Sequence, residues 1–307
     1  MNKHTSHRQI LYGLTADAHF LELLHQPQLS GTIKQVFNKA INFSINNTLY
    51  TLLCSPLDNA PNSCRIINKS FSSLNIKEND YINIIENEIH IGKGYLISFQ
   101  LCKKWQKENI KFHQDKLNNH NYLLFLNSQI NKIDVILKDS THSLFNYQGD
   151  NLFHLQISKK LNTLRAELIN VLVNREHKNL EKIINQFIGL GIGLTPSGDD
   201  YLVGLMAFLL LEKHPIHSLS SIFYQGIMQS KMNTTPISAI TLEKALEQEY
   251  RENMYQLIQS LVDAQETNIY SQVLAILNIG SSSGSDMLFG IRDALFITHS
   301  FGERYVN

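Results

Sequence analysis

Apolar and polar residues alternate along several short stretches in the first hundred residues. In residues 41–45 every second residue is apolar, Asn46 and Asn47 follow, and a second apolar run occupies residues 50–54. Alternation next to a polar turn predicts a β-hairpin. Residues 55–63 have the composition of a loop, which would end the second strand of this hairpin.

The same arrangement recurs further along the chain. Residues 81–85 and 89–91 flank Glu86 and Asn87, which predicts a second hairpin, and residues 95–99 predict another strand. Short strands of this kind indicate a small barrel or a sandwich. A helix is predicted before them, within residues 9–24.

From about residue 101 onward the apolar residues follow a helical spacing. Helices are predicted at residues 117–137, 152–174, 180–188, 198–211, 216–231 and 241–262, and a last helix is predicted to end near Ser300. The polar segment of residues 140–150 is the predicted domain boundary. We therefore expect an α+β fold, with a β-rich N-terminal domain with flanking helices at residues 1–145 and a mostly α-helical C-terminal domain at residues 146–307.

The balance of charged residues and the length of the apolar runs argue against nucleic-acid and membrane-spanning proteins. The 307 residues include 27 Lys and Arg and 27 Asp and Glu, so the formal net charge is zero. Nucleic-acid binding depends on basic patches, and the sequence has no long run of Lys or Arg, which argues against that class. The longest apolar run, residues 202–211, falls far short of the ~20 residues that a membrane span requires.

The cysteines and the N-terminal residues favour a cytoplasmic protein. Cys54, Cys64 and Cys102 are odd in number and form no C-x-x-C motif. They therefore predict reduced thiols, without a disulfide framework or a zinc site. Polar residues interrupt every apolar run in residues 1–20, which argues against a signal peptide.

One stretch departs from an ordinary globular sequence. Residues 189–204, GLGIGLTPSGDDYLVG, place four glycines within ten residues, followed by two carboxylates and an apolar run. Ser197 is the predicted N-cap of a buried helix, with Asp199 and Asp200 in its first turn. One interpretation is a glycine-rich turn that leads into a capped helix. The other is a ligand site, in which backbone N–H groups hold an anion and the two aspartates hold Mg²⁺.

Known nucleotide and hydrolase motifs do not explain the glycines. Residues 193–198 have the glycine spacing of a Walker A loop, but Asp199 and Asp200 stand where Lys and Ser or Thr belong. The third glycine of a dinucleotide-binding fingerprint is missing. Residues 280–284 match the G-x-S-x-G nucleophile elbow, which must follow a strand, whereas residues 273–277 are predicted to be helical.

The pattern S-G-x-D-x-L-x-G occurs twice, at residues 197–204 and 283–290. The two copies predict two helix N-termini of the same design, which either face one ligand or are independent caps. Between them lies a hydroxyl-rich segment that contains Thr235 and Ser238. These two residues either cap the helix that follows or contact a ligand.

Taken together, these segments resemble the AllH family, which is typified by a subunit of oxamate carbamoyltransferase. The resemblance rests on residues 189–204, 234–245 and 280–290, and more loosely on the N-terminal half, at residues 36–40 and 52–61. Three positions depart from residues that are common in the family. Ile192 stands for a Pro, Gln248 for a Gly and Ser285 for a large aromatic residue.

The resemblance implies a subunit of a multi-subunit enzyme. The typical enzyme interconverts oxamate and carbamoyl phosphate with oxalurate and phosphate in allantoin (purine) breakdown. The implied companions are an acyl-CoA-synthetase-like subunit and a third subunit, and the implied substrates are small anions. The alternative is a non-catalytic assembly or scaffold subunit of such a complex.

Candidate residues follow from the chemistry, because carbamoyl transfer requires stabilisation of the phosphate leaving group and polarisation of the carbonyl. The candidate catalytic residues are Asp199, Asp200 and Asp286, and Asp199 and Asp200 are also the candidate Mg²⁺ ligands. The candidate anion- or substrate-binding residues are Gly191, Gly193, Thr195, Ser197, Gly198, Thr235, Ser238, Ser283, Gly284 and Arg292. The enzyme hypothesis predicts that Asp199→Asn or Asp200→Asn removes activity without unfolding the protein. The assembly hypothesis predicts an effect on complex formation alone.

Overall fold

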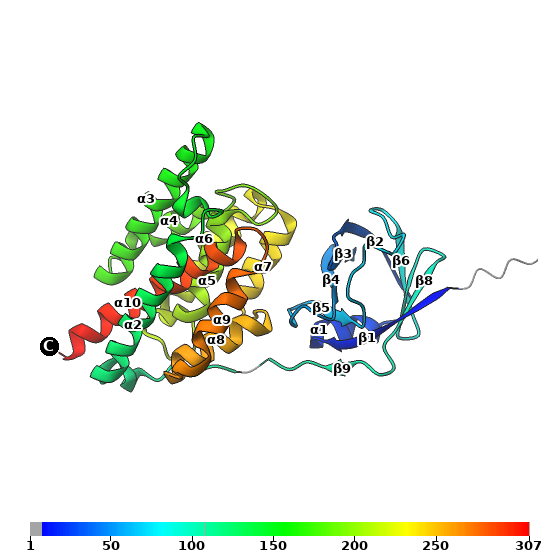
Figure 1. The fold of residues 1–307 in the computed structure, drawn as a ribbon, viewed down its shortest axis with the longest axis horizontal. Helices are drawn as coiled ribbons and strands as arrows, with labels where there is room; N and C mark the ends of the chain where they lie inside the picture. The colour runs from blue at the N-terminus through cyan, green and yellow to red at the C-terminus, as the bar shows by residue number, and fades with distance from the viewer. Residues whose placement is uncertain (1–7, 108, 307) are drawn as a thin grey trace, which may run out of the picture. The chain divides into compact units, whose positions relative to one another are not determined.

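The computed structural model describes residues 8–107 and 109–306. They belong to two compact units, which meet in sequence between residues 108 and 109. The first unit is built from β-strands and the second from helices (Figure 1). This confirms the expected α+β fold, with the β-rich part first.

The first unit is a closed β-barrel. The strands follow the order β5-β4-β3-β2-β6-β7-β8-β1, and β5 pairs with β1 to close the ring. Strand β9 pairs with Thr15 and Ala16 at the end of β1, beyond the residues that pair with β8. Closure leaves few unpaired strand edges. The strands are β1 Gln9–Ala16, β2 Leu29–Val36, β3 Ala40–Ile45, β4 Thr48–Cys54, β5 Ser63–Ile66, β6 Tyr81–Ile85, β7 Glu88–Ile91, β8 Tyr95–Ser98 and β9 Lys103–Lys104.

Both predicted hairpins are present. Asn46 and Asn47 join β3 to β4, and Glu86 and Asn87 join β6 to β7. All four residues have positive φ, between 50° and 64°. A two-residue turn with positive φ at both positions matches the right-handed twist of the flanking strands, which explains why these short polar pairs set the register.

The helix predicted within residues 9–24 is present and occupies the second half of that range. Residues 9–16 form strand β1, which pairs with β8 and β5, and only helix α1, Ala18–Leu24, is helical. The Asp17 side chain accepts a hydrogen bond from the backbone N–H of Phe20 and so caps the helix. Long-range pairing to two strands therefore overrode the local helical pattern.

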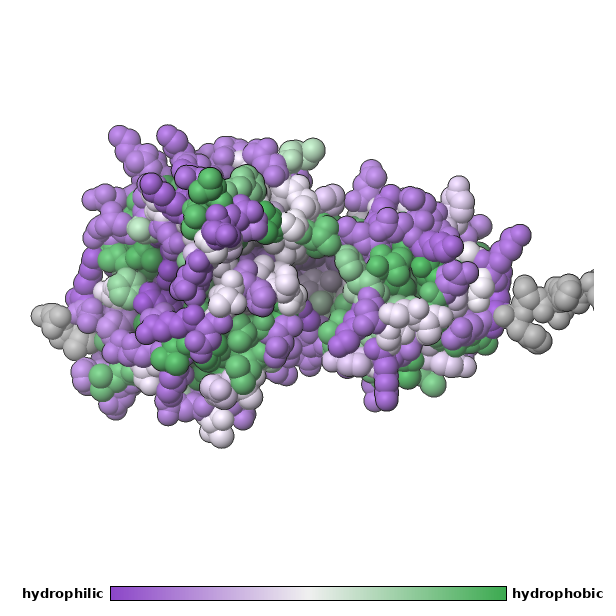
Figure 2. Space-filling view, turned by 45° about the horizontal axis from the view of Figure 1, so that its top comes forward, coloured by the Kyte–Doolittle hydropathy of each residue, from purple (hydrophilic) through white to green (hydrophobic). Residues whose placement is uncertain are grey.

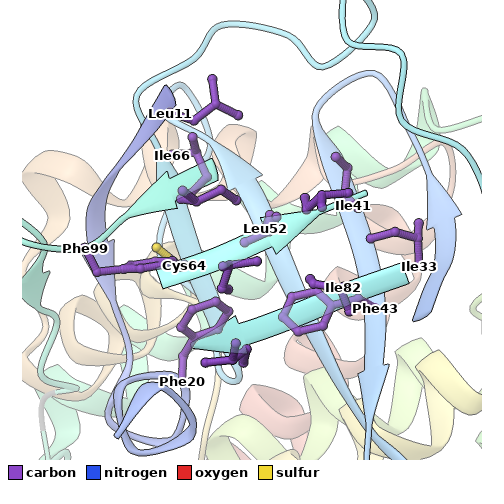
Figure 3. Close-up of a cluster of buried hydrophobic side chains, with 14 of the residues drawn as sticks. Leu11, Phe20, Ile33, Ile41, Phe43, Leu52, Cys64, Ile66, Ile82 and Phe99 are labelled. Atoms are coloured by element: carbon purple, nitrogen blue, oxygen red, sulfur yellow. The ribbon is translucent and has the colours of Figure 1, made fainter. Parts of the chain in front are cut away.

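The barrel interior is filled by apolar side chains that alternate along the strands. Figure 3 shows Phe20 of α1, Phe43 of β3 and Ile82 of β6 pointing into one shared core. The Phe20 and Phe43 rings meet edge to face, with 6.1 Å between their centroids. A filled interior of this kind is a packed core that stabilises the barrel.

The second unit is a bundle of helices joined by short 3₁₀ turns. Its α-helices are α2 His120–Lys138, α3 Leu152–Asn174, α4 Leu180–Phe187, α5 Ser197–Leu209, α6 Ser220–Ser230, α7 Pro236–Leu246, α8 Glu252–Asp263, α9 Glu266–Leu277 and α10 Ser283–Val306. The most extensive helix pairing joins α5 and α10, which lie in the middle of this unit (Figure 1). All side chains of α5 are buried.

The compact units place the boundary earlier than the predicted one at residues 145 and 146. Helix α2 would fall into the N-terminal domain by the sequence-based boundary, but it packs against α10. The polar segment of residues 140–150 is instead a connection within the helical unit, and Ser143 in it is fully buried. The polar composition of this segment suggested an exposed linker between domains, whereas part of it is a buried polar contact.

The predicted continuous helix at residues 241–262 is also wrong. Helix α7 ends at Leu246 and α8 begins at Glu252. Gln248 between them has φ +56°, a left-handed conformation that ends a helix. Glycine adopts this conformation at less cost than a residue with a side chain does.

No helix in the described part of the chain is long and apolar enough to cross a bilayer. Apolar side chains nevertheless reach the surface of each unit, and Figure 2 shows hydrophobic patches among mostly hydrophilic residues. The exposed apolar side chains of the helical unit include Leu152 and Phe153 at the start of α3 and Ile192 and Leu194 in the glycine-rich loop.

The barrel has its own core and closed hydrogen bonding, so we expect a fragment of residues 1–108 to fold by itself. Its free energy of unfolding should be on the order of 5 kcal/mol, at the lower end for small domains. Circular dichroism of the purified fragment would show β structure and one cooperative thermal transition. A broad transition without cooperativity would contradict this expectation.

Candidate functional site

Three glycines shape the loop between α4 and α5. Gly189, Gly191 and Gly193 have φ of +75°, +144° and +89°, which side-chain-bearing residues rarely adopt. A Cβ on Gly189 would lie 2.2 Å from the carbonyl oxygen of Asn233, and one on Gly191 would lie 2.3 Å from the backbone N of Ser197. The backbone path of residues 189–196 therefore requires glycine at these two positions for both its angles and its close contacts.

Helix α5 begins one residue earlier than predicted. Pro196 is the N-cap and Ser197 is the first helical residue, so the predicted capping role of Ser197 is wrong. The backbone N–H groups of Asp199 and Asp200 donate to the carbonyl oxygen of Pro196. A Cβ on Gly198 would lie 2.2 Å from the carbonyl oxygen of Phe187, so this glycine lets the end of α4 approach the first turn of α5.

Asp199 is a buried cross-link. Its side chain has no exposed surface, and it accepts hydrogen bonds from the backbone N–H of Gly189 at 2.8 Å, from the Ser238 hydroxyl at 2.6 Å and from the Thr234 hydroxyl. Burial raises the pKa of Asp199, and these three donors oppose the rise. The carboxyl thus ties the glycine-rich loop to the start of α7.

The hydroxyl-rich segment before α7 is divided between two roles. Thr235 is the N-cap of α7, because its Oγ accepts the backbone N–H of Ser238 at 3.1 Å. The same hydroxyl donates to the carbonyl oxygen of Leu194 in the glycine-rich loop. Ser238 donates to Asp199. The capping interpretation is therefore confirmed for Thr235, and Ser238 holds the loop in place.

The two copies of the S-G-x-D-x-L-x-G pattern meet in space. The Thr195 and Ser283 hydroxyl oxygens are 2.7 Å apart, which joins the start of α5 to the start of α10. A Cβ on Gly204 would lie 2.0 Å from the carbonyl oxygen of Met287, and one on Gly290 would lie 2.1 Å from that of Tyr201. The two helix backbones therefore cross in direct contact.

These contacts are reciprocal. Gly204 and Gly290 hold the same position of the pattern, and so do Tyr201 and Met287, so each copy makes the contact that the other returns. The helices that precede α5 and α10 also pack in the same way. A Cβ on Gly284 would lie 2.0 Å from the carbonyl oxygen of Ile276, so this glycine lets the end of α9 approach α10, as Gly198 does for α4 and α5. The pairs α4–α5 and α9–α10 are thus related by a local pseudo-twofold.

Asp200 and Asp286 are the aspartates that both copies share. Asp286 has no exposed surface and Asp200 is 1% exposed, and the Oδ2 atom of each is buried without a hydrogen-bond partner in the described chain. Burial and, second, the charge of Asp286 raise the pKa of Asp200 well above its usual range. Hydrogen bonds from the hydroxyls of Thr195 and Ser283 lower this pKa in part. Burial raises the pKa of Asp286 to about 6, although hydrogen bonds from the hydroxyls of Ser143, Ser197 and Ser282 lower it in part.

This arrangement does not favour the expected Mg²⁺ site at Asp199 and Asp200. Asp199 contacts Gly189, Thr234 and Ser238, whereas Asp200 interacts with Thr195, Ser283 and Asp286, so the adjacent carboxyls face different neighbours. Over the described residues, no group of three or more His, Cys, Asp and Glu side chains is placed to hold a metal ion. A Mg²⁺ site needs several oxygen ligands around one point.

Arg292 does not lie with the loop as expected. Its guanidinium forms a two-pronged pair with Asp134 of α2, at 2.9 and 3.0 Å, and contacts Asp293 at 3.1 Å. Burial acts against a positive charge there, but these carboxylates raise the pKa of Arg292 overall. The Arg292 guanidinium is therefore paired within the helical unit, where its ion pair with Asp134 joins α2 to α10.

The sequence interpretation missed several buried partners of the site. Ser143 donates to Asp286 and Thr234 donates to Asp199. Asp293 accepts from Arg165 of α3 and, at 2.9 Å, from the Tyr201 hydroxyl. Each is one ordinary residue whose partner lies far away in sequence, so no local pattern marks it, although Ser143 and Thr234 both lie in polar segments that separate apolar runs.

The loop itself leaves backbone donors available. Within the described residues, no acceptor takes a hydrogen bond from the backbone N–H groups of residues 191–195. Residues 192–194 are exposed and Thr195 is half-buried. Unpaired N–H groups next to a helix N-terminus are a favourable setting for an anion. Chemically, the loop can offer hydrogen bonds to a small anion, with the Thr195 and Ser283 hydroxyls at its base.

Models of known protein families match residues in both units. Residues 187–295 match the family model described as oxamate carbamoyltransferase subunit AllH, and residues 12–104 match that of the AllH family N-terminal domain. No solved structure matches the chain. The matched ranges contain the barrel strands β2 to β9 and both copies of the glycine–aspartate pattern. The chain therefore belongs to the AllH family, whose name is that of an oxamate carbamoyltransferase subunit.

Proposed function

We propose that this chain supplies part of the substrate site of an enzyme that transfers a carbamoyl group between carbamoyl phosphate and oxamate. The loop of residues 191–195 would hold the phosphate of carbamoyl phosphate. The observation that carries the proposal is the row of N–H groups at residues 191–195 without an acceptor in the described chain, in a partly exposed loop next to the point where the N-termini of α5 and α10 meet. Both helix dipoles favour negative charge at that point.

The chemistry needs such a group of donors. When the oxamate amide nitrogen attacks the carbamoyl carbon, the bond to the phosphate oxygen breaks and phosphate leaves with the bonding electrons. The proton that the amide nitrogen loses ends on the released phosphate. Fixed N–H donors stabilise the charge that develops on this leaving group. Asp200 and Asp286 are shielded from solvent behind Thr195 and Ser283. We therefore assign them a supporting role rather than contact with the substrate.

Companion subunits would complete the site. Residues 189–197 contain no Lys or Arg, and Arg292, the candidate cation for a phosphate, is paired with Asp134. Ile192 and Leu194 are 43% and 44% exposed in the same loop. Apolar side chains next to a polar binding loop are typical of a contact with another protein. An acyl-CoA-synthetase-like subunit and a third subunit are the partners that the family resemblance implies.

The second candidate is an assembly subunit without a site of its own. The same exposed Ile192 and Leu194 favour it, since the loop would then serve only as a docking element. The two candidates differ in ligand binding. In the first, small anions bind at the loop, whereas in the second only partner subunits do.

A glycine substitution in the loop tests the proposal. The Gly193→Ala change adds a Cβ that meets nothing within 4 Å, but it disfavours the φ of +89° that aims the neighbouring N–H groups. We expect carbamoyl phosphate, phosphate, oxamate or oxalurate at ~100-fold its dissociation constant to stabilise the wild-type protein by about 2.7 kcal/mol. The variant should lose most of this stabilisation. Thermal denaturation with and without Mg²⁺ measures it.

Gly92→Ala is the matched control, because Gly92 also has a positive φ, +53°, and open space around it, but lies in the barrel. It should keep the full ligand-induced shift. If wild-type protein shows no shift with any of these anions, even with companion subunits present, the substrate-site proposal fails. The double variant Ile192→Asn, Leu194→Asn should then weaken complex formation, as the assembly hypothesis predicts.

A further inference from the structure

The buried pair Asp200 and Asp286 has no evident source of neutralisation. Each carboxyl lies in the first turn of its helix, at the same position of the repeated pattern, on the local pseudo-twofold that relates α5 to α10. Two ionised carboxylates in such a place would repel each other and lose their hydration, at a cost of several kcal/mol.

The groups around the pair offer hydroxyls but no positive charge. Asp200 interacts with Asp286, Asp199, Thr195 and Ser283. Besides Asp200, Asp286 interacts with three hydroxyls, those of Ser143 from the turn before α3, of Ser197 from α5 and of Ser282 from the turn before α10.

The charged side chains on the neighbouring helices pair elsewhere. Arg165 of α3 and Arg292 of α10 bind Asp293, and Arg292 also binds Asp134 of α2. Asp199 is fully hydrogen bonded to the loop and to the start of α7. None of these groups supplies a proton or a cation to the pair.

The hydrogen bonding of the pair identifies what is missing. One oxygen of each carboxyl is buried without a hydrogen-bond donor in the described part of the chain. Buried carboxylate oxygens without a partner are rare because the lost hydration is not replaced. The contact between the Thr195 and Ser283 hydroxyls brings the starts of the two helices together. One proton held between two carboxyls makes one carboxyl a donor and leaves the other an acceptor.

We propose that Asp200 and Asp286 share a single proton at neutral pH and that this proton joins the N-termini of α5 and α10. The pair then carries one negative charge in place of two, and the first turns of both helices accommodate that charge. The inference does not depend on the proposed substrate site, because it concerns the protein without ligand. It does explain how two acids can lie directly behind a loop that offers donors to an anion.

Infrared spectroscopy of the unmodified protein tests the proposal directly. At pH 7.5 exposed carboxyls are ionised, so a protonated carboxyl C=O band that shifts in D₂O must come from a buried acid. We expect such a band in the wild-type protein and in the control Asp139→Asn, which removes an exposed aspartate. We expect it to disappear in Asp200→Asn and also in Asp286→Asn, because the asparagine amide then donates to the remaining carboxylate.

A linkage measurement gives a second readout. The folded protein holds a proton that the unfolded chain releases above about pH 5, so rising pH favours unfolding. For one proton, the equilibrium constant for unfolding rises tenfold per pH unit until the pair releases it. Denaturant titrations between pH 6 and 8 should show this slope in wild type relative to Asp200→Asn, in which the pair holds no proton.

Three outcomes would overturn the proposal. The first is a wild-type spectrum without the band at pH 7.5, which needs no variant to fold. The second is a band that persists in Asp286→Asn, since the proton would then belong to Asp200 alone. The third is stabilisation of wild type, but not of Asp200→Asn, by Mg²⁺, Ca²⁺ or K⁺ with no protonated band, which would place a cation between the carboxyls.

Discussion

Replacing Gly204 by alanine is expected to destabilise the helical unit by about 3 kcal/mol or more, at the upper end of overpacking effects. The added Cβ would lie 2.0 Å from the carbonyl oxygen and 2.9 Å from the Cα of Met287. Both atoms belong to the backbone of α10, so no side-chain rotation relieves the clash. The two central helices would have to separate, which breaks contacts along all of α5.

Gly290→Ala should behave in the same way, because its Cβ would lie 2.1 Å from the carbonyl oxygen of Tyr201. Gly302→Ala is the graded comparison within α10. The first atom that its Cβ meets is a methyl group of Leu123, which can rotate, so we expect a smaller loss. Denaturant unfolding followed by the helical circular dichroism signal measures all three. Equal stability of Gly204→Ala and Gly302→Ala would contradict the crossing described for α5 and α10.

Replacing Asp199 by asparagine is expected to destabilise the protein by about 3 kcal/mol, because an amide cannot accept from all three buried donors. At least one of Gly189, Thr234 and Ser238 would lose its acceptor, and the new NH₂ group would face another donor. The loop and the start of α7 would separate. The expectation that Asp199→Asn removes activity without unfolding is therefore revised.

The neighbouring substitution Asp200→Asn provides the contrast. Its buried Oδ2 loses no donor from the rest of the described chain, and the asparagine amide can donate to Asp286 in place of the shared proton. We expect its stability at pH 7.5 to equal or exceed that of wild type. Urea titrations of the two variants side by side decide the matter. A loss of similar size in both would falsify the division between a structural Asp199 and a paired Asp200.

Much of the fold follows from local sequence. The hairpins around Asn46 and Glu86 were predictable because two polar residues with access to positive φ separate alternating strands. Helix α3 matches its predicted bounds, residues 152–174, since apolar spacing and a capping Asn151 agree. Strand β1 was not predictable, because its residues are fixed by pairing with β8 and β5 and not by their own propensity.

The candidate site divides along the same line. The repeated S-G-x-D-x-L-x-G pattern marked both helix starts and both members of the aspartate pair, because glycine contacts and first-turn acids are encoded within a few residues. The role of Arg292 was misjudged because its partner, Asp134, lies far away in sequence. Ser143 was missed for the same reason.

The sequence by itself determined the order of a β-rich and a helical part, the position of the glycine-rich loop and the likeness of two helix N-termini. These depend on short-range physics, which includes backbone conformation, spacing of apolar residues and capping. Only the tertiary structure decided that the two N-termini meet, that Asp199 binds the loop and that the charge of Asp286 acts on Asp200. Burial and distant partners determine the chemistry of a carboxyl, and both arise only when remote segments pack together.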